Sequence, residues 1–326
     1  MIALLGASGY IGQAFAAELT RSRMAFLPVS RAEIDYAKFG VLLQFLRSRK
    51  PALVINAAGH TGRPNVDACE EQKAETLQGN TLLPAIVAQA CLAAGIPWAH
   101  ISSGCIYSGG KVLVDGRWVV ERNLNVPHLR ELFRTSPDRF RGFTETDPPN
   151  FTFRSPPCSF YSGTKALAEE ALASLDGGYI WRLRIPFDEF DNSRNYISKL
   201  LRYPRIYDNI NSLSHRGDFA RACLDLWRRQ APTGIYNVTN PGAVSAEDVV
   251  GLIVEVLRPQ RKFQFWADDK EFYRLGAITP RSNCIMDVGK LLAAGVRVRP
   301  VHEALREALE AWQPETANKS KGIESI

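Results

Sequence analysis

The sequence has no long hydrophobic run, no dense basic cluster and no closely spaced pair of cysteines. A membrane-spanning helix needs an apolar run of about 18 residues, and no run approaches that length, so we expect no membrane span. The six cysteines lie far apart, and His215 and His302 have no metal partner at ligand spacing, so we predict neither a metal site nor a redox dithiol. Because no secretory segment precedes the first predicted strand, we expect a cytoplasmic protein with reduced thiols.

The numbers of basic and acidic residues indicate which kinds of ligand the protein can bind. The chain has 40 Lys and Arg residues against 34 Asp and Glu residues, giving a net charge of +6. This slight excess favours anionic ligands. The basic stretches 228–229 and 258–262 are short and are typical of a solvated surface. We therefore predict no nucleic-acid partner.

Short apolar segments alternate with helical patterns through the first half of the chain. We expect strands at residues 2–5, 24–29, 52–56, 98–103 and 179–184, and helices at residues 10–22, 39–48, 75–94 and 162–174. This alternation predicts an α/β fold with a Rossmann-type doubly wound parallel sheet. The pattern loosens after Pro186, with further helices at residues 246–257 and 301–312, which indicates a smaller mixed α/β substrate lobe.

The predicted domains divide the chain as follows. Residues 1–184 plus 212–240 form the dinucleotide-binding domain, and residues 185–211 plus 241–314 form the substrate-binding lobe. Residues 108–150 are rich in Gly, Pro, Arg and Asp, and we expect them to form a long insertion, acting as a lid beside the site. The polar residues 315–326 are predicted to be a disordered tail.

A glycine pattern joins the first predicted strand to the first helix, in the run Gly6-Ala7-Ser8-Gly9-Tyr10-Ile11-Gly12. Its glycines permit a tight turn, a close approach to a pyrophosphate and close helix packing, as in dinucleotide-binding proteins. The second strand ends at Ser30 and Arg31 without an acidic residue, and an arginine there suits a 2′-phosphate. We therefore favour NADP(H), with NAD(H) as the alternative, and expect Asp35 to bind the adenine.

Three further residues predict a hydride-transfer site for a carbonyl. Ser103 ends a predicted strand, and Tyr161 and Lys165 lie one helical turn apart. A free tyrosine has a pKa of about 10, and we expect the adjacent Lys165 ammonium to lower the pKa of Tyr161. Ser103 can donate a hydrogen bond to the carbonyl oxygen, where charge develops.

A cysteine stands two residues after this serine, at Cys105. A thiolate beside a ketone can remove the acidic proton on a neighbouring carbon. Most free cysteines are instead small buried apolar residues. The spacing alone leaves both interpretations of Cys105 open.

Together these residues resemble the extended short-chain dehydrogenase/reductase family, in its dTDP-4-dehydrorhamnose reductase branch. The sequence is most similar to the bifunctional nucleotide-4-keto-6-deoxyglucose 3,5-epimerase/4-reductases of UDP-rhamnose synthesis. The shared stretches span most of the chain, and two of them do not belong to the general reductase pattern. These two are residues 60–67, His-Thr-Gly-Arg-Pro-Asn-Val-Asp, and residues 234–242, Gly-Ile-Tyr-Asn-Val-Thr-Asn-Pro-Gly.

The resemblance implies roles for individual residues. Ser103, Tyr161 and Lys165 fall on the reductase triad, Cys105 on the epimerisation cysteine and Lys199 on its partner acid. The implied cofactor contacts are Gly6, Ser8, Gly9, Tyr10, Ile11, Gly12, Ser30, Arg31, Asp35, Ala57, Ala58, Gly59, Tyr161, Lys165 and Pro186. The expected substrate contacts are Thr61, Arg63, Asn80, Ser103, Asn195, Arg202 and Arg281, with the two last arginines suited to a diphosphate.

The function expected from this resemblance is epimerisation of carbons 3 and 5 of a nucleotide-4-keto-6-deoxyhexose, followed by NADPH-dependent reduction of its 4-ketone. The partner is a UDP- or dTDP-sugar, and a homodimer is a family expectation. Related 4,6-dehydratases place an Asp-Glu pair where this chain has Gly104 and Cys105, so dehydration is not expected. Two alternatives stay open: a 4-ketoreductase with an idle cysteine, and a non-catalytic NADP-binding regulatory subunit.

Overall fold

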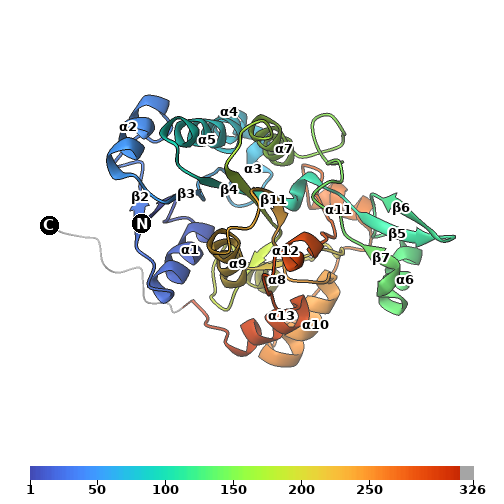
Figure 1. The fold of residues 1–326 in the computed structure, drawn as a ribbon. Helices are drawn as coiled ribbons and strands as arrows, with labels where there is room; N and C mark the ends of the chain where they lie inside the picture. Colours follow the sequence, from blue (N-terminus) through green and yellow to red (C-terminus); the bar gives the residue numbers. More distant parts are fainter. Residues whose placement is uncertain (316–326) are drawn as a thin grey trace.

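A six-stranded parallel sheet forms the centre of the computed structural model, which describes residues 1–315 (Figure 1). The strand order is β11-β8-β4-β3-β1-β2, and every neighbouring pair is parallel. This confirms the predicted doubly wound sheet. The strands are β1 (Ile2–Leu5), β2 (Phe26–Val29), β3 (Leu53–Asn56), β4 (Trp98–Ser103), β8 (Gly178–Leu183) and β11 (Gly234–Asn237).

Helices cover both faces of this sheet (Figure 1). Successive side chains of a strand point to opposite faces, and in β1 the side chains of Ile2 and Leu4 join one core cluster while those of Ala3 and Leu5 join the other. Burial on both faces explains why the strands are almost continuously apolar. One face is covered by α1 (Tyr10–Arg21), α9 (Arg216–Arg228) and α12 (Gly289–Ala293), the other by α2 (Phe39–Arg49), α5 (Leu83–Ala94) and α7 (Phe160–Leu172).

The helix expected at residues 75–94 is interrupted. The chain forms α3 (Ala68–Glu71), α4 (Lys73–Leu77), a π-helical turn (Gln78–Leu82) and then α5. The continuous stretch Lys73–Ala94 is long and apolar enough to cross a membrane by length and composition, but half of it is buried inside the protein. Its α5 part packs on the sheet, with α2 and α7 beside it, so we interpret the stretch as a core helix.

A smaller lobe packs around its own hydrophobic core. The core includes Phe187, Ile197, Leu213, Val249 and Leu305. Its elements are β9 (Pro186–Phe187), β10 (Ser214–His215), α8 (Tyr196–Arg202), α10 (Ala246–Leu257), α11 (Asp269–Leu275) and α13 (Val301–Glu310). Residues 288–296, which we expected in this lobe, pack on the main sheet through α12. Conversely, residues 213–215, which we expected in the dinucleotide-binding domain, join this lobe through Leu213 and β10. The division into two domains stays a prediction, and residues 316–326 of the predicted tail lie outside the described residues.

The insertion at residues 108–150 has secondary structure of its own. It contains β5 (Gly110–Val114), β6 (Arg117–Glu121), α6 (Pro127–Thr135), a 3-10 turn (Pro137–Arg139) and β7 (Phe140–Arg141), with the strand order β6-β5-β7. The side chains of Asn123 and Asn125 donate to the Asp269 carboxylate at 2.9 and 2.6 Å, which ties the insertion to α11. The role of the insertion as a lid stays a prediction.

Candidate active site

The glycine turn forms a cradle at the carboxyl end of β1. Strand β1 lies between β2 and β3, so the chain changes direction across the sheet at this point, where α/β proteins bind ligands. Gly6 has φ +74°, and a Cβ on it would lie 2.6 Å from the Ala58 nitrogen. A Cβ on Gly12 would lie 2.0 Å from the Gly6 oxygen. No side chain caps the start of α1, so its backbone N–H groups fit a pyrophosphate.

The end of β2 differs from our expectation, because an acidic side chain does stand there. The Glu33 carboxylate accepts hydrogen bonds from the nitrogen and the hydroxyl of Ser30, both at 3.0 Å. These bonds lower the pKa of Glu33. The neighbouring Arg31 guanidinium lies 5.6 Å from the centre of the Tyr36 ring. The site therefore offers a cation for a 2′-phosphate and a carboxylate for a ribose hydroxyl.

Two other predicted cofactor residues are held by local contacts. The Tyr10 hydroxyl donates to Asp188 at 3.2 Å, and the Tyr10 ring lies 4.3 Å from the Arg216 guanidinium. The Asp35 carboxylate accepts from the Ala37 nitrogen at 3.3 Å and pairs with Lys38. The binding of adenine by Asp35 stays a prediction.

The predicted reductase residues and the cysteine come together. Ser103 ends β4, and the Cys105 nitrogen donates to its hydroxyl at 3.2 Å. Cys105 lies in the 3-10 turn Gly104–Ile106 and belongs to a buried apolar cluster against which Tyr161 of α7 packs. One turn along α7, the Lys165 ammonium donates to the Ile101 carbonyl at 3.1 Å. A Cβ on Gly59, at the end of β3, would lie 3.9 Å from this ammonium, so the cofactor cradle and the catalytic residues adjoin.

Burial controls the protonation of this cluster. Burial raises the pKa of Tyr161, and this effect outweighs the lowering by the Ser103 hydroxyl and the Arg184 guanidinium. Our expectation that Lys165 lowers the pKa of Tyr161 is therefore wrong for this structure. Burial also raises the pKa of Cys105. It lowers the pKa of Lys165 to about 8. At neutral pH the cluster therefore holds a phenol and a thiol.

Lys199 of α8 belongs to a group of cations beside this cluster. Burial, together with Arg194 and Arg281, lowers the pKa of Lys199 to about 8. Arg194 donates to the Thr61 hydroxyl at 2.7 Å and has no carboxylate partner within residues 1–315. Burial and the nearby Arg63 lower the pKa of Arg194. Sequence reasoning missed Arg194, although it stands in a stretch that carries the family resemblance.

The two arginines expected to hold a diphosphate are already paired. Arg281 binds both Asp67 oxygens, at 2.5 and 2.6 Å, and Arg202 donates to Asp191 at 2.8 Å. A guanidinium neutralised by a carboxylate is a poor anion site. Arg194, which carries a free charge, fits a phosphate better than either.

The two asparagines expected as substrate anchors are fully buried and structural. The Asn80 amide both accepts from the nitrogen and donates to the oxygen of His60, each at 2.8 Å. It lies in the π-helical turn and fixes the loop after β3. Asn195 caps α8 by accepting from the Ile197 nitrogen at 2.9 Å, and its amide donates to Asp188. Neither side chain has surface left for a substrate.

A second buried arginine, Arg184, was not anticipated. It follows β8, whose Leu183 pairs with Ser103, so it adjoins the turn that holds Cys105. Its guanidinium donates to the Asn211 side chain at 2.7 Å and to the Ser282 carbonyl, while its Nε has no partner. No carboxylate pairs with it among the described residues, and its charge opposes the rise in the pKa of Cys105 and of Tyr161. Arg184 can therefore stabilise a negative charge in the cluster.

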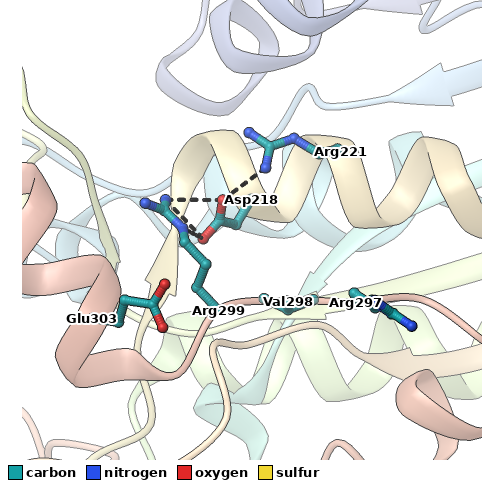
Figure 2. Close-up of a pocket in the computed structure, with 6 residues that line it drawn as sticks. All are labelled: Asp218, Arg221, Arg297, Val298, Arg299 and Glu303. Atoms are coloured by element: carbon teal, nitrogen blue, oxygen red, sulfur yellow. Dashed lines mark hydrogen bonds and ion pairs between the residues drawn. The ribbon is translucent and has the colours of Figure 1, made fainter.

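A hollow outside this site lies between α9 and the segment before α13. Figure 2 shows Asp218 bridged by Arg299 and Arg221. Arg299 donates to both carboxylate oxygens at 3.0 Å, and Arg221 donates at 3.3 Å. Arg299 also pairs with Glu307, and Arg221 lies 3.9 Å from Glu18. Because carboxylates balance these two cations, we interpret the hollow as a structural tie between these segments.

Comparison with known proteins relates this geometry to a family. The family model described as RmlD substrate binding domain matches residues 1–313. A bifunctional dTDP-4-dehydrorhamnose 3,5-epimerase/dTDP-4-dehydrorhamnose reductase of Arabidopsis thaliana is 32% identical over 263 residues, covering 80% of this chain and 77% of that protein.

A longer relative contains a matching part. The trifunctional UDP-glucose 4,6-dehydratase/UDP-4-keto-6-deoxy-D-glucose 3,5-epimerase/UDP-4-keto-L-rhamnose-reductase of Arabidopsis thaliana is 31% identical over 265 residues. The match covers 81% of this chain and 35% of that protein, so the chain spans about a third of its length.

Solved structures share the fold. A UDP-rhamnose synthase from Acanthamoeba polyphaga mimivirus superposes with a TM-score of 0.79 at 25% identity, covering 95% of this chain and 99% of the other. More distant neighbours, at 19% to 20% identity, were solved with NADP, NADPH or NAD. The resemblance seen in the sequence is thereby confirmed: the chain belongs to the RmlD substrate-binding-domain family and is an enzyme of that family.

Proposed function

We propose that this enzyme epimerises carbons 3 and 5 of a nucleotide-4-keto-6-deoxyhexose and reduces the 4-ketone, giving a nucleotide-L-rhamnose-type sugar. The observation that carries this proposal is that Cys105 packs in one buried cluster with Tyr161, and that its backbone nitrogen donates a hydrogen bond to the Ser103 hydroxyl. In the alternative, a plain 4-ketoreductase, this thiol has no chemical role and only fills the apolar cluster. The names of the matched relatives support a UDP- or dTDP-linked sugar as the substrate.

The reductive step uses Ser103, Tyr161 and Lys165. A nicotinamide dinucleotide, for which we favour NADP(H) over NAD(H), would supply the hydride from the cradle of Gly6, Gly9 and Gly12. Ser103 holds the ketone oxygen, and Tyr161, kept protonated by burial, gives this oxygen its proton. The nearby Lys165 ammonium stabilises the phenolate that is left.

The epimerisation step uses the same hydrogen bonds to the ketone oxygen. Hydrogen bonds from Ser103 and Tyr161 stabilise the enolate that forms when a carbon beside the ketone loses its proton. The Cys105 thiolate removes this proton, and the Lys199 ammonium returns one to the opposite face of the ring, which inverts the carbon. Arg184 favours the thiolate electrostatically. Arg194, which has no carboxylate partner within residues 1–315, and the nearby Arg63 suit the diphosphate.

Replacing Cys105 with Ser should abolish exchange and spare reduction. A serine keeps the size and the backbone hydrogen bond to Ser103, but its hydroxyl is far too weak an acid to supply a base near neutral pH. We expect hydrogen exchange at carbons 3 and 5 to fall by about 10²-fold or more. Reduction of a ketone that is already epimerised should stay within a few-fold, measured by NADPH consumption.

The matched control is Cys158→Ser, because Cys158 is another free cysteine near the site with no proposed role. This variant should keep both activities. Full exchange in Cys105→Ser would favour the alternative of a plain 4-ketoreductase with an idle cysteine. Absence of any turnover in the unmodified enzyme would favour a regulatory subunit.

The rate of hydrogen exchange at carbons 3 and 5 should increase as the pH rises through neutrality. The Cys105 pKa is raised above its usual value, so the thiolate fraction grows about tenfold per pH unit, while Lys199 stays charged up to its pKa of about 8. Above about pH 8, the loss of ammonium offsets the gain of thiolate and the rate levels off. Deuterium incorporation followed by NMR checks this profile. A rate that is flat or falls from about pH 6 to pH 8 would exclude this pair of groups.

The substrate, the location and the oligomeric state are proposed on separate grounds. The substrate is a nucleotide-diphosphate sugar. A cytoplasmic location is proposed from the reduced state of the cysteines. The homodimer is proposed from the family resemblance.

A further inference from the structure

A β-hairpin in the insertion projects from the body of the protein (Figure 1). Strands β5 and β6 pair in antiparallel register from Gly110–Glu121 to Val114–Arg117, and Asp115 and Gly116 join them. Both turn residues have positive φ, +48° and +75°, as in the type I′ turn that closes tight hairpins. The hairpin is therefore well specified.

The turn determines which backbone groups of β6 point outwards. In such a hairpin the residues flanking the turn form a hydrogen-bonded pair, and bonded and non-bonded pairs then alternate. Arg117, Val119 and Glu121 thus bond to β5, while the N–H and C=O groups of Trp118 and Val120 point away from it. The Leu113 carbonyl, opposite Trp118, accepts from the Arg139 side chain at 2.5 Å, as this alternation requires.

The outer edge of β6 is unpaired in the described chain. Strand β6 is the terminal strand of its sheet, and no other segment of residues 1–315 donates to the Trp118 or Val120 backbone or accepts from it. Proteins usually protect such an edge with charged side chains, especially lysine, or with proline, a bulge or a covering loop. Strand β6 has no lysine or proline, and its two charged residues, Arg117 and Glu121, stand at its ends. Its central Val119 and Val120 side chains are 42% and 49% exposed.

We propose that β6 pairs antiparallel with β6 of a second copy of this chain, about a two-fold axis at Val119. Trp118 of each copy then faces Val120 of the other, and their free backbone groups form about four hydrogen bonds. Arg117 of each copy faces Glu121 of the other, at both ends of the contact. The two three-stranded sheets become one continuous sheet.

The charges select this register. Two neighbouring registers, centred on Trp118 or on Val120, also let the outward backbone groups pair. In the first, Arg117 faces Val119, and in the second it faces Asn123. Only the register centred on Val119 opposes each arginine with a glutamate, and opposite charges on facing strands are stabilising. The contact between five-residue strands is smaller than a standard stable interface, so we expect a dimer that dissociates on dilution.

A charge-reversal series tests the register. Arg117→Glu replaces two opposite-charge pairs by two like-charge pairs, and should weaken the dimer by about tenfold in analytical ultracentrifugation across a concentration series. Glu121→Arg should do the same. The double variant Arg117→Glu with Glu121→Arg should restore the dimer. The matched control is Arg297→Glu, an equal charge change at an exposed arginine beside the hollow of Figure 2, and it should leave assembly unchanged.

A backbone substitution provides a second test. Val120→Pro removes an N–H group that points away from β5, so the hairpin survives while the contact between copies loses hydrogen bonds. We expect this variant to be monomeric at concentrations at which Val120→Ala, which keeps the N–H group, is dimeric. The Trp118 and Val120 amides should also gain protection from hydrogen exchange as concentration rises.

Three results would overturn the proposal. One is a protein that stays monomeric at every concentration. Another is a dimer that is unaffected by Val120→Pro. The third is a double charge reversal that fails to restore what each single reversal removes. The series reads assembly and amide protection alone, so its outcome is independent of the proposed reaction.

Discussion

Replacing Tyr161 with Phe should lower ketone reduction by about 10²- to 10⁴-fold, the range for loss of a general acid. The ring packs against the apolar cluster that contains Cys105, and a phenylalanine keeps this packing. The change removes only the hydroxyl that gives the ketone oxygen its proton. Steady-state NADPH consumption measures the loss, and fluorescence titration with NADPH should show an affinity within a few-fold of the unmodified enzyme.

The matched control for this prediction is Tyr179→Phe. Tyr179 is a buried tyrosine of β8 whose hydroxyl donates only to the Ala231 carbonyl, at 2.6 Å. Its loss should cost about 1 kcal/mol of stability, typical of one hydrogen bond, without changing turnover. If Tyr161→Phe and Tyr179→Phe retained equal turnover, the assignment of the proton donor would be wrong.

Replacing Glu169 with Ala should lower the free energy of unfolding by about 3–5 kcal/mol, the cost of leaving a buried charge unpaired. The Glu169 carboxylate binds the Arg182 guanidinium at 2.6 Å and accepts from the Ser102 hydroxyl at 2.5 Å. Both charged side chains are almost fully buried. Burial lowers the pKa of Arg182, and Glu169 more than offsets this effect. The guanidinium stays charged when its partner is removed, because arginine is effectively always protonated in proteins. Denaturant unfolding of both proteins measures the difference.

The adjacent glutamate provides the control. Glu170 lies on the same helix and pairs with Arg154 at 2.7 Å, but both side chains are exposed. Exposed pairs contribute about 0–1 kcal/mol, so Glu170→Ala should change stability by no more than this. Similar losses in Glu169→Ala and Glu170→Ala would mean that the buried pair does not support the strands beneath the site.

The sheet could be predicted from the sequence because its strands are buried on both faces. Runs such as Leu53–Asn56 are apolar almost without interruption and are bounded by helical patterns. The ends of the five predicted strands are within two residues of those observed, since turn residues and caps mark them. The sixth strand, β11, was not predicted as a strand. The π-helical turn at Gln78–Leu82 could not be predicted. Its residues fit an ordinary helix, and the contacts of Asn80 with the distant His60 backbone determine its shape.

The candidate site was only partly predictable, because the sequence does not show which charges meet. Arg281 is neutralised by Asp67, which is 214 positions away in the chain, whereas Arg194 has no such partner in the part of the chain that the structure describes. The spacing of Ser103 and Cys105 indicated their proximity. It did not indicate how far burial raises the pKa of Cys105. Arg184 could be found only from the register of β8 beside β4.

The central claim is that one pocket carries out both proton exchange and reduction. The most direct measurement is incubation of the enzyme with NADPH and UDP- or dTDP-4-keto-6-deoxyglucose in deuterated water, with NMR of the product. The account predicts deuterium at carbons 3 and 5 of a reduced sugar, and hydrogen from NADPH at carbon 4. A reduced sugar without deuterium at carbons 3 and 5, beyond that of an enzyme-free control, would contradict it.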